Sequence, residues 1–195
     1  MADINSEGAG RQRAEIPQLT GSEVLTDDGR PVISPDLISC VELFYFAYRD
    51  FTCDPDTILE QYGFGRAHHR VLHFVHRNPG LKVAELLDIL KITKQSLARV
   101  LKQLVDEGFV IQRAGSEDRR ERRLYLSAKG VRLTDKLTQI QVKRIEGALA
   151  ALGPGADALA RQFLFAMIAE KDRPQVEILI KGQRADAAGA PGRSE

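Results

Sequence analysis

The sequence is short of several residue types, and each shortage excludes a class of protein. Two cysteines among 195 residues cannot build the disulfide framework of a small secreted protein. No stretch reaches the roughly 18 consecutive apolar residues that a membrane-spanning helix needs. Residues 1–13 mix charged residues with glycine and serine and lack the apolar core of a secretory signal. We therefore expect a cytoplasmic protein with no membrane partner.

Motifs of catalysis and cofactor binding are also missing. The sequence contains no P-loop, no nucleophile elbow and no carboxylate pair that a helical pattern would hold together. Residues 63–68 are similar to half of a dinucleotide fingerprint, but they lack the third glycine and follow a predicted helix instead of a strand. We expect neither enzymatic activity nor a bound cofactor or metal.

Charge is present in quantity and is strongly segregated. The formal net charge of the whole chain is only +1. Residues 91–132 nevertheless contain 11 basic and 5 acidic side chains, whereas residues 1–36 contain 3 basic and 7 acidic ones. A local excess of this kind favours a polyanionic partner.

Helices are predicted before the basic segment. Residues 1–33 show no periodicity and predict a flexible acidic tail. Ser34-Pro35-Asp36 is typical of a helix start, and apolar spacing predicts a helix to about residue 52. Asp54-Pro55-Asp56 predicts the start of a second, short helix that ends near residue 62. A further helix is expected from Arg66 to Arg77.

The basic segment changes from helical to strand-like periodicity. A short helix over 83–90 and a turn precede a helix over 94–107, with Thr93 as its N-cap and an apolar stripe at helical spacing. Residues 109–113 and 122–126 alternate as the strands of a β-hairpin with a long basic tip. The predicted fold is therefore mainly α with a small β-hairpin wing, a winged helix-turn-helix.

Helices are also predicted after the hairpin. Ser127 is a suitable N-cap for a long helix to about residue 152, and a last helix is expected over about 156–170. The end of the chain, residues 173–195, is predicted to be mostly disordered. The apolar residues of the flanking helices exceed what a core of this size needs, which makes a partner surface plausible.

The exposed side chains of the predicted motif suit duplex DNA. A helix fits the major groove, where glutamine can pair with adenine and arginine with guanine. Arginines on a thin hairpin can enter the narrow minor groove, where the potential is most negative. The candidate DNA-contacting residues are Lys94, Gln95, Ser96, Arg99, Lys102, Arg119, Arg120, Arg122 and Arg123.

Several short motifs follow one another in this region. Pro79-Gly80-Leu81 precedes Val83-Ala84-Glu85-Leu86-Leu87 and Ile92-Thr93-Lys94-Gln95-Ser96-Leu97, and the wing contains Asp118, Arg120, Leu124, Leu126 and Ser127. In this order they resemble the DNA-binding core of MarR-type winged helix-turn-helix transcriptional regulators. The resemblance covers residues 66–130 closely and 35–172 with the flanking helices. Residues 44–49 and 63–69 also resemble a PetP-type branch from alphaproteobacteria. Lys82 departs from the Thr or Ser that the family often has as N-cap.

The resemblance implies a homodimer that regulates transcription by binding a pseudo-palindromic operator and responds to a small molecule or another signal. Helix 94–107 would enter the major groove and wing 115–123 the minor groove, with Asp118 orienting Arg120. The implied division is a tail (1–33), a dimerisation helix and short helix (34–65), the DNA-binding domain (66–127), two dimerisation helices (128–172) and a tail (173–195). The alternative is a winged-helix protein-interaction module without specific DNA binding, which would favour an apolar or acidic surface in place of the basic one.

Histidine and cysteine residues leave further alternatives open. His69, His73 and His76 share one helical face, which suits either a metal site or a proton-sensitive pocket wall; the absence of an accompanying acid pair or cysteine favours the wall. Tyr45 and Tyr48 could complete an effector pocket with His69 and His73. Cys40 and Cys53 suit either inert thiols or redox sensors; the acids around Cys53 and the apolar neighbours of Cys40 favour inert thiols.

Overall fold

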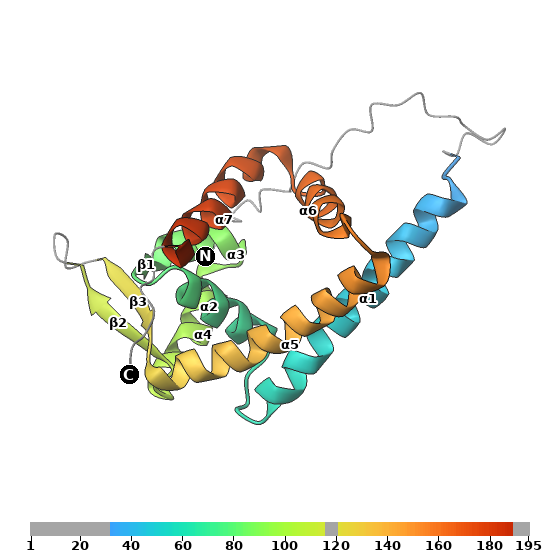
Figure 1. Cartoon of the computed structure of the whole chain (residues 1–195). Coiled ribbons are helices and arrows are strands. Elements are labelled where there is room, and N and C mark those ends of the chain that lie inside the picture. Colours follow the sequence, from blue (N-terminus) through green and yellow to red (C-terminus); the bar gives the residue numbers. More distant parts are fainter. Residues whose placement is uncertain (1–31, 116–120, 189–195) are drawn as a thin grey trace, which may run out of the picture.

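The computed structural model describes residues 32–115 and 121–188, except the side chains of residues 182–188, and its fold is mainly helical with one small sheet (Figure 1). This confirms the predicted fold class. Residues 1–31 of the expected tail (1–33) and the wing residues Asp118, Arg119 and Arg120 lie outside the described residues. The elements are α1 (Pro35–Glu60), α2 (Arg66–Arg77), β1 (Leu81–Lys82), α3 (Val83–Leu90), α4 (Lys94–Asp106), β2 (Val110–Ala114), β3 (Arg122–Leu126), α5 (Ala128–Leu152), α6 (Ala156–Ala166), η1 (Glu170–Asp172) and α7 (Arg173–Ala188).

The core lies where α2, α3, α4 and the sheet meet. Leu72, Leu86, Leu104 and Leu124 come from these four elements and are 0% exposed. Phe109, between α4 and β2, is equally buried and packs edge-on against Phe64 with ring centroids 5.0 Å apart. The helix-turn-helix and the wing therefore share one apolar core, which fixes α4 relative to the strands.

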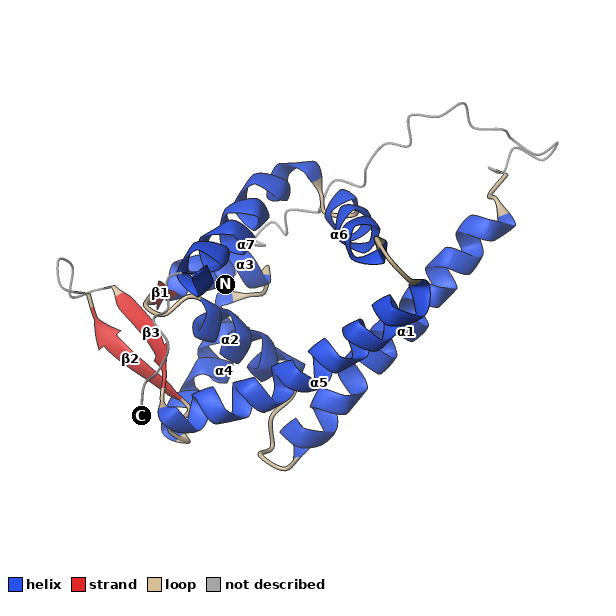
Figure 2. Cartoon of the chain, in the orientation of Figure 1, coloured by secondary structure: helices blue, strands red, loops and turns tan. Residues whose placement is uncertain are grey.

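The sheet has three strands, one more than the sequence predicted. The strand order is β1-β3-β2, and all pairings are antiparallel. The extra strand, β1, contains only Leu81 and Lys82, which is too short to show an alternating pattern in the sequence. Figure 2 shows β2 and β3 projecting from the helical body on the side opposite the free end of α1.

The starts of α4 and α5 are capped as predicted. The Thr93 hydroxyl accepts a hydrogen bond from the Ser96 amide at 3.2 Å, and the Ser127 hydroxyl accepts one from the Gly130 amide at 3.1 Å. A Cβ on Gly130 would lie 2.2 Å from the Phe109 carbonyl oxygen, so only glycine fits there. This close approach joins the first turn of α5 to the residue that starts the wing.

The predicted break at Pro55 is wrong. The structure has one continuous helix, α1, with Pro55 in its interior. Proline removes one backbone hydrogen bond and usually ends or kinks a helix. Here Pro55 and Leu59 are buried and Asp54 is paired with Arg144 of α5 at 2.7 Å. Tertiary packing against α5 thus keeps the helix intact across the proline.

The prediction of a mostly disordered chain end is wrong for residues 173–188, which form α7. The last predicted helix is correspondingly shorter and ends at Ala166. Val176 and Leu179 recur at helical spacing and line a cavity shared with Ile89 and Ile168. Lys91, in the turn between α3 and α4, also pairs with Asp172 at 3.3 Å. The last residues are rich in alanine and glycine, and this composition favoured a prediction of disorder where the structure has a helix.

Apolar side chains remain outside the core on α1 and α6. Every residue from 32 to 49 is exposed, and α6 has no buried residue. Figure 1 shows the first turns of α1 extending beyond the other helices. In spite of these apolar residues, none of the helices in the described ranges is long and apolar enough to cross a membrane.

Candidate nucleic-acid interface

Helix α4 presents one buried face and one exposed face. Its apolar stripe of Leu97, Val100, Leu101 and Leu104 is buried in the core. Four of the candidate residues, Lys94, Gln95, Arg99 and Lys102, are exposed on the other side, and Ser96 is half-buried. The periodicity of the sequence therefore placed these side chains on the correct face.

The exposed side chains differ in how they are held. Ser96 accepts a hydrogen bond from the Thr93 hydroxyl at 2.9 Å, and Lys102 is paired with Asp106 one turn later. Lys94, Gln95 and Arg99 have no hydrogen bond or ion pair to any residue within the described ranges. Gln95, Ser96 and Arg99 line a common hollow on the surface. Polar groups left without a partner on a rigid helix are available to an incoming ligand.

Gln103 does not join this face, although its spacing on the helix predicts that it should. Its side-chain oxygen lies 2.9 Å from Nε2 of His68, and its nitrogen donates to Glu107 at 3.0 Å. The His68 ring also stacks on Phe64 at 4.8 Å between centroids. Gln103 thus connects α4 to the start of α2, and this positioning role has no signal in the local sequence pattern.

The strands divide the arginines of the wing between two faces. Successive residues of a strand point to opposite sides, so Arg122 lies on the side of buried Leu124 while Arg123 lies on the outer side. Arg113 of β2 pairs in register with Arg123 and lies over the Tyr125 ring at 5.1 Å. Arg113 is exposed and was missed as a candidate, because strand register cannot be inferred from the sequence alone.

Among the described residues of the wing, the acid that forms ion pairs is Glu121, which directly precedes β3. Its carboxylate lies 2.6 Å from the Lys82 ammonium and 3.7 Å from the Arg123 guanidinium. The hydrogen bond from Lys82 to Glu121 raises the pKa of Lys82, with their opposite charges as the second cause. The predicted pairing of Asp118 with Arg120 involves two residues outside the described ranges and stays a prediction.

Three of the four residues suggested for an effector pocket line one cavity. Tyr48, His69 and His73 line a space of about 550 Å³ between α1, α2 and α5, together with Arg66, Gln141 and five further residues. Arg66 lies 5.7 Å from the Tyr48 ring and donates to Asp56 at 2.8 Å. The fourth residue, Tyr45, does not line this cavity and is 68% exposed.

The two histidines of this cavity are shifted toward their neutral forms. Burial lowers the pKa of His69, and burial with the neighbouring charges of His69, Arg77 and His76 lowers the pKa of His73 to about 4. Both rings are therefore uncharged at neutral pH. Within the described part of the chain, no three His, Cys, Asp or Glu side chains are arranged to hold a metal ion.

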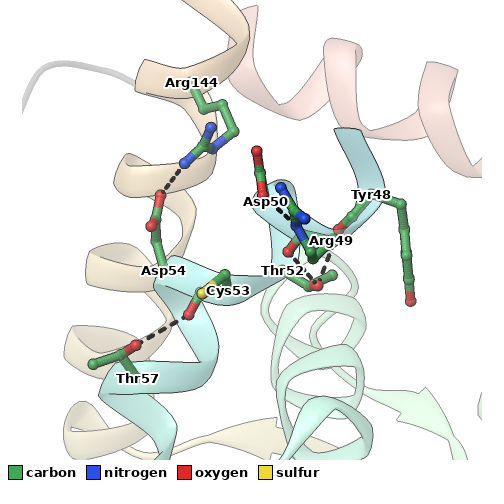
Figure 3. Close-up of polar contacts among 8 residues, drawn as sticks. All are labelled: Tyr48, Arg49, Asp50, Thr52, Cys53, Asp54, Thr57 and Arg144. Carbon is green, nitrogen blue, oxygen red and sulfur yellow. Dashed lines mark hydrogen bonds and ion pairs between the residues drawn. The ribbon is translucent and has the colours of Figure 1, made fainter. Parts of the chain in front are cut away.

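Charged side chains join α5 to the part of α1 that lines this cavity. Figure 3 shows Arg144 of α5 meeting Asp54 of α1, while Arg49 pairs with its neighbour Asp50 at 2.8 Å. The Tyr48 side chain points away from this cluster in the same view. Cys53 lies beside it and is exposed, as is Cys40. The apolar sequence neighbours of Cys40 therefore do not bury it, because this half of α1 lies outside the core.

Comparisons with known proteins identify similar chains. A family model described as the MarR family matches residues 62–121. The HTH-type transcriptional regulator PetP of Rhodobacter capsulatus is 48% identical over 139 residues, which cover 71% of this chain and 84% of the relative.

Solved structures show the same fold at low sequence identity. Streptococcus pneumoniae FabT in complex with DNA has a TM-score of 0.61 at 14% identity, covering 68% of this chain and 94% of that one. A S. aureus MepR–DNA complex has a TM-score of 0.54 at 17% identity, covering 70% and 96%. The transcriptional regulator SlyA has a TM-score of 0.55 at 18% identity, covering 68% and 91%.

Proposed function

The chain belongs to the MarR family of transcriptional regulators, and from this premise we propose that it binds a pseudo-palindromic DNA operator as a homodimer. The family is one of regulators and not of enzymes. The observation that carries the proposal is the exposed face of α4, where Gln95 and Arg99 stand without partners among the described residues on a helix fixed by the core. As a regulator that acts on DNA, the protein is proposed to reside in the cytoplasm.

Helix α4 is proposed to enter the major groove. Gln95 and Arg99 lie one turn apart, so both can reach base edges from the same side of the helix. Ser96 lies between them, and Lys94 and Lys102 extend the basic face toward the phosphates on either side. FabT and MepR are each described in complex with DNA, which supports the same role for this fold here.

The wing is proposed to contact the minor groove. Arg119 and Arg120 belong to its tip, with Asp118 orienting Arg120, and Arg122 and Arg123 follow at the start of β3. A narrow A·T-rich minor groove concentrates negative potential and attracts inserted arginines. Binding should therefore be strongest where such a segment flanks the site that α4 contacts.

The homodimer is proposed to form through the helices on either side of the DNA-binding domain. Leu37, Val41 and Phe44 of α1, Phe163 of α6 and Met167, which directly follows α6, are all at least 45% exposed. So many large exposed apolar side chains are unusual on a monomer, and exposed apolar surface of this kind usually marks an interface. Residues 34–65 and 128–172 thus form the proposed dimerisation region, and residues 66–127 the DNA-binding domain.

The cavity between α1, α2 and α5 is the proposed site of a small-molecule effector. Its volume of about 550 Å³ lies in the range of ligand pockets, and its neutral histidines, tyrosine and arginine offer orienting polar groups. Because α1 belongs to the proposed dimer interface and α2 to the DNA-binding domain, a ligand there would change how the two are arranged.

A salt titration of DNA binding tests the central proposal. The magnitude of the slope of log K against log salt concentration should be about 0.9 for each phosphate contact on random duplex DNA, and a site selected from a random duplex pool should bind far more tightly. Binding without salt dependence, or a pool from which no sequence is enriched, would favour the protein-interaction module instead.

A further inference from the structure

The outer face of the sheet carries a row of three cations. Lys82 of β1 pairs in register with Arg123 of β3, and Arg123 pairs with Arg113 of β2. Residues that pair directly across antiparallel strands point to the same face, with Cβ atoms about 4.5–5.5 Å apart. Like charges at that separation repel one another, so a nearby acid would offset the repulsion within this row.

Glu121 is the acid that lies close to this row. It stands two residues before Arg123 and so points to the same face of the sheet. Its carboxylate holds the Lys82 ammonium at 2.6 Å and Arg123 at 3.7 Å. Its backbone carbonyl also accepts a hydrogen bond from the Gly115 amide at 3.1 Å, which closes the base of the hairpin loop. Side chain and backbone of this one residue thus join three parts of the wing.

The attachment matters because the link between the wing and α3 is short. β1 contains two residues and leads directly into α3, of which Lys82 is the N-cap. The Lys82–Glu121 pair therefore ties the loop end of β3 to the first turn of the helix-turn-helix. The side chains of the pair are 38% and 30% exposed, and exposed ion pairs contribute little to stability. Its effect should appear in the direction of the wing and not in the stability of the fold.

We propose that Glu121 is a positioning residue for DNA binding, which orients the wing against α3 by holding Lys82 and Arg123 together. Lys82 stands at this N-cap in place of the expected Ser or Thr, and its ion pair with Glu121 gives the lysine a role at this position. The inference rests on the proposed function, because that function assigns to the wing a contact with the minor groove. Without Glu121 the cations of the row separate, and the wing arginines have to be ordered when DNA binds.

The test compares Glu121→Gln with the charge-swapped double variant Lys82→Glu/Glu121→Lys and with Asp88→Asn. Asp88 is an exposed acid of α3 that has no hydrogen bond or ion pair with the described residues of the wing, so its variant controls for the loss of one negative charge. Affinity is measured by fluorescence anisotropy for two short duplexes, one with an A·T-rich segment and one that is G·C-rich, at two salt concentrations. Thermal unfolding of each variant is measured in parallel.

The expected result is an A·T preference in the wild type that falls by about three- to tenfold in Glu121→Gln, with the midpoint of thermal unfolding unchanged. The charge-swapped variant should recover the preference, and Asp88→Asn should keep it while binding both duplexes slightly more tightly. A Glu121→Gln variant that behaves like Asp88→Asn, or a charge swap that recovers nothing, would overturn the positioning role. A wild type without any A·T preference would instead overturn the minor-groove placement of the wing.

Discussion

At the residue scale, Arg99 is the side chain on which sequence discrimination should depend most. It is exposed in the middle of α4 and has no partner within the described residues. A bidentate arginine–guanine pair is worth about 1–3 kcal/mol against the wrong base. Arg99→Ala should therefore lose affinity for the selected DNA site by that amount and bind random duplex nearly as well as before.

Lys102→Ala is the matched control for this prediction. Its ammonium is paired with Asp106 near the end of α4, so we expect it to contact only phosphate. The variant should bind selected and random DNA with equal losses and lower the salt slope by about 0.9 in magnitude. If Arg99→Ala gave the same uniform loss, Arg99 would be a phosphate contact too.

His73 makes the stability of the fold depend on pH. Its pKa is lowered from 6.5 to about 4 in the folded chain, so between these values the unfolded chain binds more protons than the folded one. Stability should be full above pH 6.5, fall as the pH drops toward 4, and stop falling on this account below that. Urea unfolding across this range should show the slope, and His73→Phe should reduce it. An identical slope in the variant would assign the effect to other groups.

Two positioning contacts at this scale could not be predicted. Periodicity correctly predicted which side of α4 faces outward, because each helical turn repeats the same local pattern. Gln103 and His68 are 35 positions apart, and Lys82 and Glu121 are 39 apart. Pairs so distant are brought together by the fold as a whole, so no local pattern indicates them.

At the scale of elements, the cap of α4 is a contact whose energy can be measured. The Thr93 hydroxyl accepts from the Ser96 amide, and loss of such a cap costs about 1 kcal/mol. Thr93→Ala should lower the free energy of unfolding by about that much. Thr57→Ala on α1 is the control, because the Thr57 hydroxyl only donates to the Cys53 carbonyl within a helix. Equal losses in both variants would mean that the cap is not the cause.

The elements that the sequence predicted well are those with strong local signals. The bounds of α2 and the starts of α4 and α5 follow from N-caps, glycine positions and apolar spacing. The predictions of elements that were wrong or incomplete have one cause in common. Pro55 stays inside α1 because of packing against α5, β1 exists because β3 lies beside it, and α7 lines one cavity together with α2 and α3. In each case a tertiary contact overrides or supplements the local preference.

At the scale of the whole molecule, DNA affinity and dimerisation should be inseparable. Two copies of α4 linked in one dimer convert the second half-site contact into an intramolecular event, which raises affinity without any new contact. The exposed apolar side chains of α1 and α6 are the proposed link. A protein that cannot dimerise should keep its salt-dependent binding to random DNA and lose its preference for a two-fold symmetric site.

Phe163→Glu on α6 tests this dependence. Phe163 is 58% exposed, so the substitution leaves the core of one chain intact but buries an unpaired charge in the proposed dimer. Sedimentation should show a dimer for the wild type at micromolar concentration and a monomer for the variant. Ile111→Glu, on the wing and 39% exposed, makes the same chemical change outside the proposed interface and should remain dimeric. A Phe163→Glu protein that stays dimeric would move the interface away from α6, and a monomeric wild type would reject the dimer altogether.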